Sequence, residues 1–122
     1  MPPRTLPPCP DSPNCVSTFA SREDNRHYIA PYRYSRTKAD VKAVLKAVIS
    51  SLPRTKLIDE NDAYLHYEFT SLLLRFVDDV EFVFDDETKT IHFRSASRTG
   101  YGDFGVNRRR MEEIRSRMTG KI

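Results

Sequence analysis

The stretch from residue 54 to residue 95 constrains the fold most, because it contains neither glycine nor proline and its apolar residues recur at every second position. A period of two places alternate side chains on opposite faces of a β-strand. The repeating apolar positions are Leu65, Tyr67 and Phe69, then Val80, Phe82 and Phe84, then Ile91 and Phe93. The polar run 85–89 separates the last two groups as a turn would. This pattern predicts an antiparallel meander with one apolar face.

Three consecutive leucines, residues 72–74, interrupt the alternation. Such a run fits either a strand that is buried on both faces or a bend where the chain changes direction. We interpret it as a short strand.

One helix is predicted before the meander and another after it. Before the meander, Thr37 can cap a helix whose apolar stripe recurs at helical spacing as far as Pro53, which ends the helix. The stripe consists of Val41, Val44, Leu45, Val48, Ile49 and Leu52. After the meander, residues 106–118 repeat an apolar side at the same spacing, opposite a side rich in arginine. Both helices can therefore cover the apolar face of the sheet.

The first 26 residues hold six of the eight prolines and predict an irregular arm. Residues 27–34 are aromatic and β-prone, and Pro31 restricts them to an edge strand. We therefore divide the chain into this Pro-rich arm, residues 1–26, and one domain, residues 27–122, because 122 residues suit a single domain. An exposed edge strand near residues 27–35 could also pair with a second copy, which allows a homodimer.

The predicted fold class is α+β, with a single antiparallel sheet of about four to six strands covered on one face by two helices. Its order is strand, helix, three or four strands, helix. No apolar run approaches the roughly 20 residues that span a bilayer, so no transmembrane segment is expected. The absence of a secretory signal favours the cytoplasm, and removal of an N-terminal segment would instead allow the cell envelope or periplasm.

The arm contains two cysteines, Cys9 and Cys15, with five residues between them. They can form a disulfide or redox-sensitive pair, or remain free thiols in a reducing compartment. Zinc is the weakest interpretation, because structural zinc sites need further ligands and no second cysteine pair exists. We therefore predict no metal and no cofactor.

The net charge is +3, from 20 Lys and Arg against 17 Asp and Glu, but the two signs are segregated along the chain. Residues 59–87 contain ten acidic residues and a single basic one, Arg75, whereas the segments on both sides are predominantly basic. One interpretation is that acidic and basic elements of the domain lie against each other. The other is that the basic C-terminal element binds an anion.

The run from Arg94 to Arg98, followed by the glycine-containing loop 99–105 and a helix entry, combines hydroxyl groups, guanidinium groups and backbone amides. These groups suit an anionic ligand, because helix-entry amides and arginine forks bind phosphate or carboxylate. A structural role fits equally, with Asp103 or Asn107 capping the helix and the arginines neutralising nearby acidic side chains. The glycine spacing matches neither a P-loop nor a dinucleotide fingerprint.

Two adjacent carboxylates, Asp78 and Asp79, could perform acid–base chemistry or hold a divalent cation. Adjacent residues of a strand point to opposite faces, so a facing pair would require a turn. We predict a turn that is partly buried against arginine.

Histidines offer a second candidate base. His66 and Glu68 share one strand face, and His92 and Arg94 share another that could lie beside it. A general-base site would gather such groups, although polar side chains commonly occupy the solvent face of an antiparallel sheet. No Ser-His-Asp or Cys-His arrangement follows from the spacing.

Four segments carry a family likeness: 9–16 (Cys-Pro-Asp-Ser-Pro-Asn-Cys-Val), 64–71, 76–82 (Phe-Val-Asp-Asp-Val-Glu-Phe) and 94–108. Together they resemble the domain of unknown function family 1499. The resemblance implies a small soluble domain of a kind found in bacteria and plastid-bearing organisms, in some cases behind a signal, lipoprotein or membrane segment, and without an established activity. It also implies a set of polar site positions, namely Asp78, Asp79, Arg94, Ser95, Ser97, Arg98, Asp103, Asn107 and Arg110.

The first functional hypothesis is a non-catalytic binding or accessory module. In this hypothesis Arg94, Arg98 and Arg110 receive an anionic small molecule or a carboxylate of a protein partner. Nucleic acid is a less favoured partner, because the acidic segment would repel phosphate even though residues 108–110 are all arginine.

The alternative hypothesis is a small hydrolase- or isomerase-like enzyme. Asp78, Asp79 or His66 would serve as the base, while Arg94 and Arg98 hold the substrate. A raised carboxylate pKa inside a closed pocket would favour this alternative.

Overall fold

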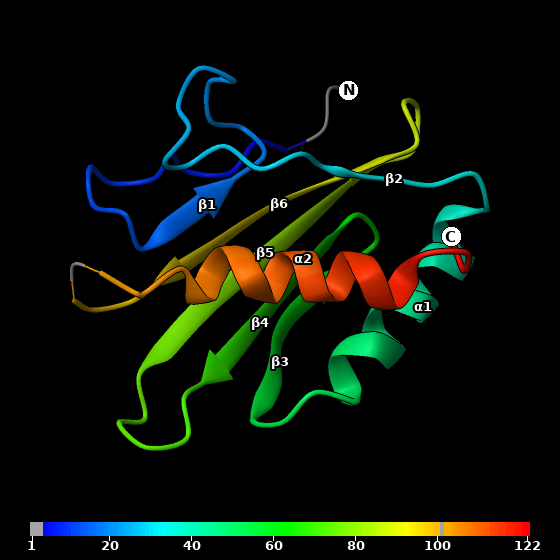
Figure 1. The fold of residues 1–122 in the computed structure, drawn as a ribbon. Coiled ribbons are helices and arrows are strands. Elements are labelled where there is room, and N and C mark those ends of the chain that lie inside the picture. The colour runs from blue at the N-terminus through cyan, green and yellow to red at the C-terminus, as the bar shows by residue number, and fades with distance from the viewer. Residues whose placement is uncertain (1–3, 101) are drawn as a thin grey trace.

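The computed structural model describes residues 4–100 and 102–122 (Figure 1). Its elements are β1 (Cys15–Ser17), β2 (Tyr32–Arg33), α1 (Lys38–Ser50), β3 (Thr55–Asn61), β4 (Tyr64–Thr70), β5 (Val77–Asp85), β6 (Thr90–Ser97) and α2 (Val106–Met118). The described residues form one six-stranded antiparallel sheet and two helices, so the predicted α+β class and element order are confirmed.

The sheet has the order β1-β6-β5-β4-β3, and β2 also pairs with β6. The central strands share a continuous register in which Phe82 lies opposite both Leu65 and Phe93. This register aligns the alternating apolar positions on one face, as the period of two predicted. The strand predicted at 27–34 is confined to the two residues of β2.

Both helices pack on the apolar face and close the main core. Thr37 caps α1 as predicted, because its hydroxyl accepts a hydrogen bond of 3.1 Å from the backbone amide of Asp40. Four residues of the predicted α1 stripe are buried, and the other two, Val44 and Leu52, are partly buried and pack against the main core. In α2 the buried apolar residues are Met111, Ile114 and Met118. Among the described residues, no helix is long and apolar enough to cross a membrane.

The N-terminal arm lies against the opposite face of the sheet. Leu6 and Phe19 of the arm pack with Tyr64 and Val83, whose side chains point away from the helices. The arm is not irregular throughout, because β1 pairs with β6 through Cys15–Ala96 and its two neighbouring pairs. The partners of β1 are residues 94–96 at the edge of β6. They lie far from β1 in the sequence, so the local pattern does not predict this pairing.

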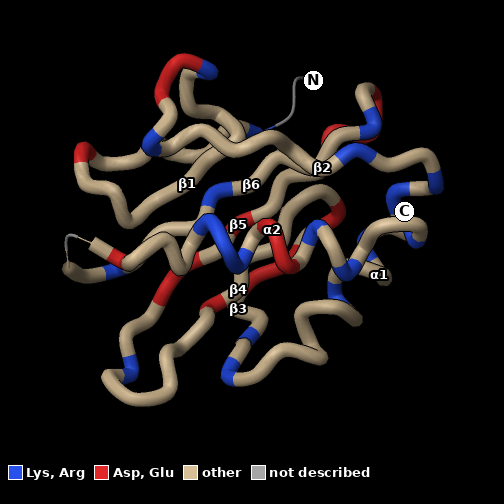
Figure 2. Tube along the Cα trace, in the orientation of Figure 1, with Lys and Arg blue, Asp and Glu red and all other residues tan. Residues whose placement is uncertain are grey.

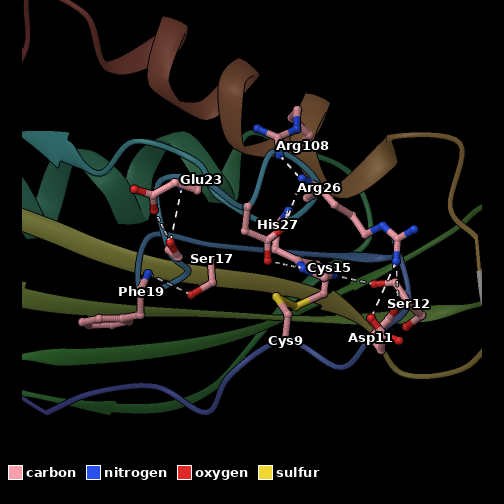
Figure 3. Close-up of polar contacts among 12 residues, drawn as sticks. Cys9, Asp11, Ser12, Cys15, Ser17, Phe19, Glu23, Arg26, His27 and Arg108 are labelled. Carbon is pink, nitrogen blue, oxygen red and sulfur yellow. Dashed lines mark hydrogen bonds and ion pairs between the residues drawn. A yellow bond between two sulfur atoms is a disulfide. The ribbon is translucent and has the colours of Figure 1, made fainter.

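A disulfide between Cys9 and Cys15 closes the start of the arm, with the two Cα atoms 5.7 Å apart (Figure 3). His27 holds the same segment, since its ring nitrogens lie 2.8 Å from the Ser12 carbonyl oxygen and 2.7 Å from the Asp24 carboxylate. Burial lowers the pKa of His27, but these two contacts outweigh burial and leave the pKa above its usual value. The disulfide therefore joins the two ends of loop 9–15, and His27 holds its middle through Ser12.

Two local predictions are wrong. Leu72, Leu73 and Leu74 form an exposed bend rather than a strand, because Ser71 and Phe76 hydrogen-bond to each other and turn the chain from β4 into β5. The carboxylates at 78 and 79 lie within β5 rather than in a turn, since β4 and β6 pair with both positions.

Candidate functional site

The acidic segment lies among cationic elements, which agrees with the first interpretation of the charge pattern (Figure 2). Lys42 and Lys46 of α1 form ion pairs of 3.0 Å and 2.8 Å with Glu60 of β3. Two arginines of the C-terminal segment, Arg98 and Arg110, pair with carboxylates of β4 and β5. The segregated charges therefore neutralise one another inside the domain.

The nine predicted site residues do not form one cluster, because β5 and β6 send alternate side chains to opposite faces of the sheet. The helix-side group consists of Asp78, Ser95, Ser97, Asp103, Asn107 and Arg110. The arm-side group consists of Asp79, Arg94 and Arg98. The sheet itself separates the two groups.

Arg110 is the centre of the helix-side group. Its guanidinium donates to Asp78 Oδ2 at 2.7 Å, to Asn107 Oδ1 at 2.9 Å and to Ser95 Oγ at 3.1 Å. The side chains of Arg110 and Asp78 are only 13% and 11% exposed, and the guanidinium lies 4.7 Å above the ring of Phe69. Because the charge of Arg110 is already matched by a buried carboxylate, an anionic ligand would compete with Asp78 for this guanidinium.

Asn107 connects this group to the arm and to the glycine loop. The Asn107 side chain is fully buried. Its Nδ2 is hydrogen-bonded to Asp103 Oδ2 at 2.8 Å, to Ser97 Oγ at 3.0 Å and to the Asn14 carbonyl at 3.2 Å. Its Oδ1 accepts from Ser95 Oγ at 2.7 Å. One asparagine thus joins α2, β6, the loop and the arm, which is a structural role.

Sequence reasoning missed Asn14, which belongs to the same network. Its Nδ2 donates to the Gly100 carbonyl at 2.8 Å, and its Oδ1 accepts from the Ser12 hydroxyl at 2.7 Å. The signal was present, because Ser12 and Asn14 lie between the two cysteines of the segment 9–16. The contact between Asn14 and Gly100 joins residues that lie far apart in the chain, so local spacing does not reveal it.

Asp103 fixes the entry to α2. Its carboxylate accepts hydrogen bonds from the backbone amides of Gly105 at 2.8 Å and Asn107 at 3.1 Å. Burial raises the pKa of Asp103, but hydrogen bonds from the Asn107 side chain and these amides outweigh burial and lower it. Gly105 suits this entry because its φ of 77° is unfavourable for other residues. The predicted capping role of Asp103 is therefore present.

Asp79 is the centre of the arm-side group. Arg98 contacts both of its carboxylate oxygens, at 2.7 Å and 3.0 Å, and also Glu68 at 2.8 Å. His66 Nε2 lies 2.9 Å from Asp79 Oδ1. Burial raises the pKa of Asp79, but the hydrogen bonds from Arg98 and His66 outweigh burial and lower it. This carboxylate is held ionised, whereas a raised pKa was the expected sign of an acid–base site.

Arg94 lies beneath the arm. One terminal nitrogen is 3.4 Å from the Pro8 carbonyl, while the buried Nε has no hydrogen-bond partner among the described residues. The carboxylate opposite in the sheet register, Glu81, instead accepts a hydrogen bond from the Tyr64 hydroxyl. The arm therefore covers this arginine.

A pocket of about 530 Å³ opens at the end of the sheet, beside the helix-side group. Its apolar wall comes from the β4–β5 bend and the entry to α2, namely Leu72, Leu73, Leu74, Phe76, Phe104 and Val106. Ser71, Asp78, Ser97, Thr99, Gly100, Gly102 and Asp103 complete the lining. Pockets of about 300–1,000 Å³ with apolar walls and a few polar groups are typical of small-molecule sites. Of the nine predicted site residues, Asp78, Ser97 and Asp103 line this pocket, whereas no residue of its apolar wall belongs to that set.

A second pocket of about 390 Å³ adjoins the first, since both are lined by Ser71, Leu72, Asp78 and Val106. It adds three arginines, Arg54, Arg109 and Arg110, and one acidic residue, Glu113. Arg54 Nε donates to the Thr70 carbonyl and Arg109 donates to the Phe104 carbonyl, yet neither arginine forms an ion pair within residues 4–100 and 102–122. We call the two adjoining pockets the groove. One end has an apolar wall, and at the other end Asp78 and Glu113 are paired with Arg110 and Arg117, which leaves Arg54 and Arg109 without an ion pair among the described residues.

These features define a small α+β domain whose sheet is backed by two helices, crossed by a disulfide-closed arm and ended by an apolar groove. The family model described as "Protein of unknown function (DUF1499)" matches residues 5–118, so the chain belongs to this family. The matched range includes all nine predicted positions and the groove. No curated protein and no solved structure matches the chain.

Proposed function

We propose that this protein is a non-catalytic binding module that holds an anionic amphiphile, a molecule with an apolar chain and a carboxylate or phosphate head, in the groove. The observation that carries this proposal is the continuity of the apolar pocket with a pocket containing two arginines, Arg54 and Arg109, that form no ion pair with any described residue. The apolar chain would lie against residues 72–76 and Val106. The head would lie near Arg54 and Arg109.

This proposal keeps the anion-binding hypothesis but changes the arginines that serve it. Arg98 and Arg110 are matched by carboxylates, so an anion would have to displace an existing ion pair. Arg54 and Arg109 need no such exchange. The serine and glycine groups of the predicted run still line the groove through Ser97 and its neighbouring loop.

The enzyme alternative receives less support. Its candidate bases His66 and Asp79 contact each other, but neither lines the groove, and the pKa of Asp79 is lowered. Asp78 does line the groove, but it is bound to Arg110. Residues 108–110 also form no continuous basic face for nucleic acid, since Arg110 points into the buried network.

The proposal is tested by titration calorimetry with decanoate, decanol and butyrate, each below its aggregation concentration. We expect decanoate to bind most tightly, because only decanoate has both an apolar chain and a charged head. Arg109→Gln should weaken decanoate about tenfold, the value of one hydrogen bond to a charged group, and leave decanol unchanged. Val106→Trp should abolish both by filling the groove.

Arg108→Gln is the matched control, because this neighbouring arginine contacts the Arg26 carbonyl and lies outside the groove. It should bind decanoate like the parent protein. Equal losses in Arg108→Gln and Arg109→Gln would contradict the proposed site, as would the absence of decanoate binding in the parent.

A further inference from the structure

Large apolar side chains gather at one end of the sheet. The end of β4, the start of β5 and the end of β6 meet there, because Thr70 pairs with Val77 and Asp78 pairs with Ser97. The bend 71–76 and the loop 98–105 therefore project from the same end (Figure 1). Of the eight exposed large apolar residues in the described chain, six belong to these loops and the first residue of α2.

These side chains lie in solvent rather than in the core. Leu73 is 87% exposed and Phe104 is 95% exposed. Leu72, Leu74 and Phe76 are also exposed by more than half. A cluster of this kind on a small domain marks an interaction surface, because scattered single residues are the usual arrangement.

The exposed charges around this cluster are cationic. Arg75 is the only charged residue of the bend. Residues 104–110 contain no acid and three arginines, of which Arg110 is paired with Asp78, so Arg108 and Arg109 supply positive charge there. Of the acidic residues nearby, Asp78 is paired with Arg110, and Asp103 is turned toward the amides at the α2 entry. The cluster therefore presents apolar groups and positive charge together.

We propose that the two loops dock on an anionic lipid bilayer. The docking surface consists of Leu72, Leu73, Leu74, Arg75, Phe76 and Phe104. Apolar side chains at loop tips can enter the boundary between headgroups and acyl chains, while flanking arginines contact anionic headgroups. The charge of the surface favours an anionic bilayer over a neutral partner.

This inference goes beyond the proposed ligand groove, although five residues of the docking surface, Leu72, Leu73, Leu74, Phe76 and Phe104, also form the groove's apolar wall. The two proposals are told apart by a variant that changes the groove and keeps these residues. The two proposals can therefore fail separately. Val106→Trp fills the groove but leaves the tips in place, so it should abolish decanoate binding without weakening bilayer binding.

The test is co-sedimentation with vesicles of phosphatidylcholine alone and with vesicles that also contain phosphatidylglycerol. We expect the parent protein to bind the mixed vesicles, and to bind less as salt is added. Leu73→Ser with Leu74→Ser should weaken binding about tenfold or more, since each leucine loses its burial in the lipid. Arg75→Gln should weaken it about fivefold. Phe104→Asn, which suits the positive φ of 55° at this position, should also weaken it.

Ile58→Ser is the matched control, because Ile58 is an exposed apolar residue of β3, away from the two loops. This variant should bind vesicles like the parent. Failure of the parent to bind the mixed vesicles would overturn the proposal, as would equal losses in Ile58→Ser and in the leucine variant. Self-association of the parent that is lost in the leucine variant, without vesicle binding, would assign the surface to a second copy instead.

Discussion

Two regions that meet at the start of α2 differ completely in how their side chains are used. Asn107 is fully buried and hydrogen-bonded on all sides, whereas Phe104, three residues earlier, is 95% exposed. Most of the polar residues that were candidate ligand groups are bonded to one another, whereas the surface beside them exposes mainly apolar side chains. Density of polar side chains in the sequence is therefore a poor guide to the binding surface of this domain.

The largest expected effect tests the buried side of this comparison. Arg110→Ala removes the partner of Asp78 and leaves a carboxylate with little access to water. Breaking such a pair costs about 3–5 kcal/mol of unfolding free energy. Urea denaturation of the variant and the parent measures the difference.

Arg117→Ala is the control for this substitution. Arg117 lies on the same helix and pairs with Glu113, but both side chains are about half exposed. We expect a loss below about 1 kcal/mol. If the two variants were equally stable, the network around Arg110 would not be structural, and the arginine would return as a candidate ligand group.

An intermediate effect is expected from the disulfide that closes the arm. Cys9 and Cys15 are six positions apart and hold the segment that carries Asn14 into the network. Reduction should lower the free energy of unfolding by about 2 kcal/mol, because the unfolded chain gains conformational entropy when the loop is no longer closed. Thermal melting with and without a reductant measures this change.

Cys9→Ser with Cys15→Ser provides the comparison, since reductant should then have no effect on melting. A parent protein that melts at the same temperature in both conditions would show that the arm is held without the disulfide.

The smallest expected effect tests the exposed side. Leu73→Ser removes an apolar side chain that is 87% exposed, so the free energy of unfolding should change by less than about 0.5 kcal/mol. The same denaturation series measures it. A loss as large as that of Arg110→Ala would mean that the bend packs into the fold, and the distinction between the two regions would disappear.

Local pattern was sufficient for the elements whose partners are close in sequence. The α1 stripe and the Thr37 cap follow from a period of 3.6 and a hydroxyl at the first turn, and both are present. The alternation in β4, β5 and β6 likewise gave the apolar face. The bend at Leu72–Leu74 could not be assigned in this way, because three apolar residues in a row have no period.

The candidate site depended more on long-range contacts. Adjacent residues of a strand face opposite sides, so Asp78 and Asp79 of β5 meet different arginines, Arg110 and Arg98. Which arginine meets which carboxylate depends on the register of β5 against β6 and on the placement of α2. Neither is encoded in spacing along the chain.

The sequence by itself determined the fold class, the two helices, the apolar face of the sheet and the family. These follow from periodicity and from ordered motifs, which are local properties of the chain. Only the tertiary structure decided that Asn14 bonds to Asn107 and that the bend 71–76 lies beside Phe104. Such pairs lie tens of residues apart, so their contact depends on how the sheet and α2 pack. The groove likewise exists only because the bend 71–76 and the entry to α2 leave a gap between them.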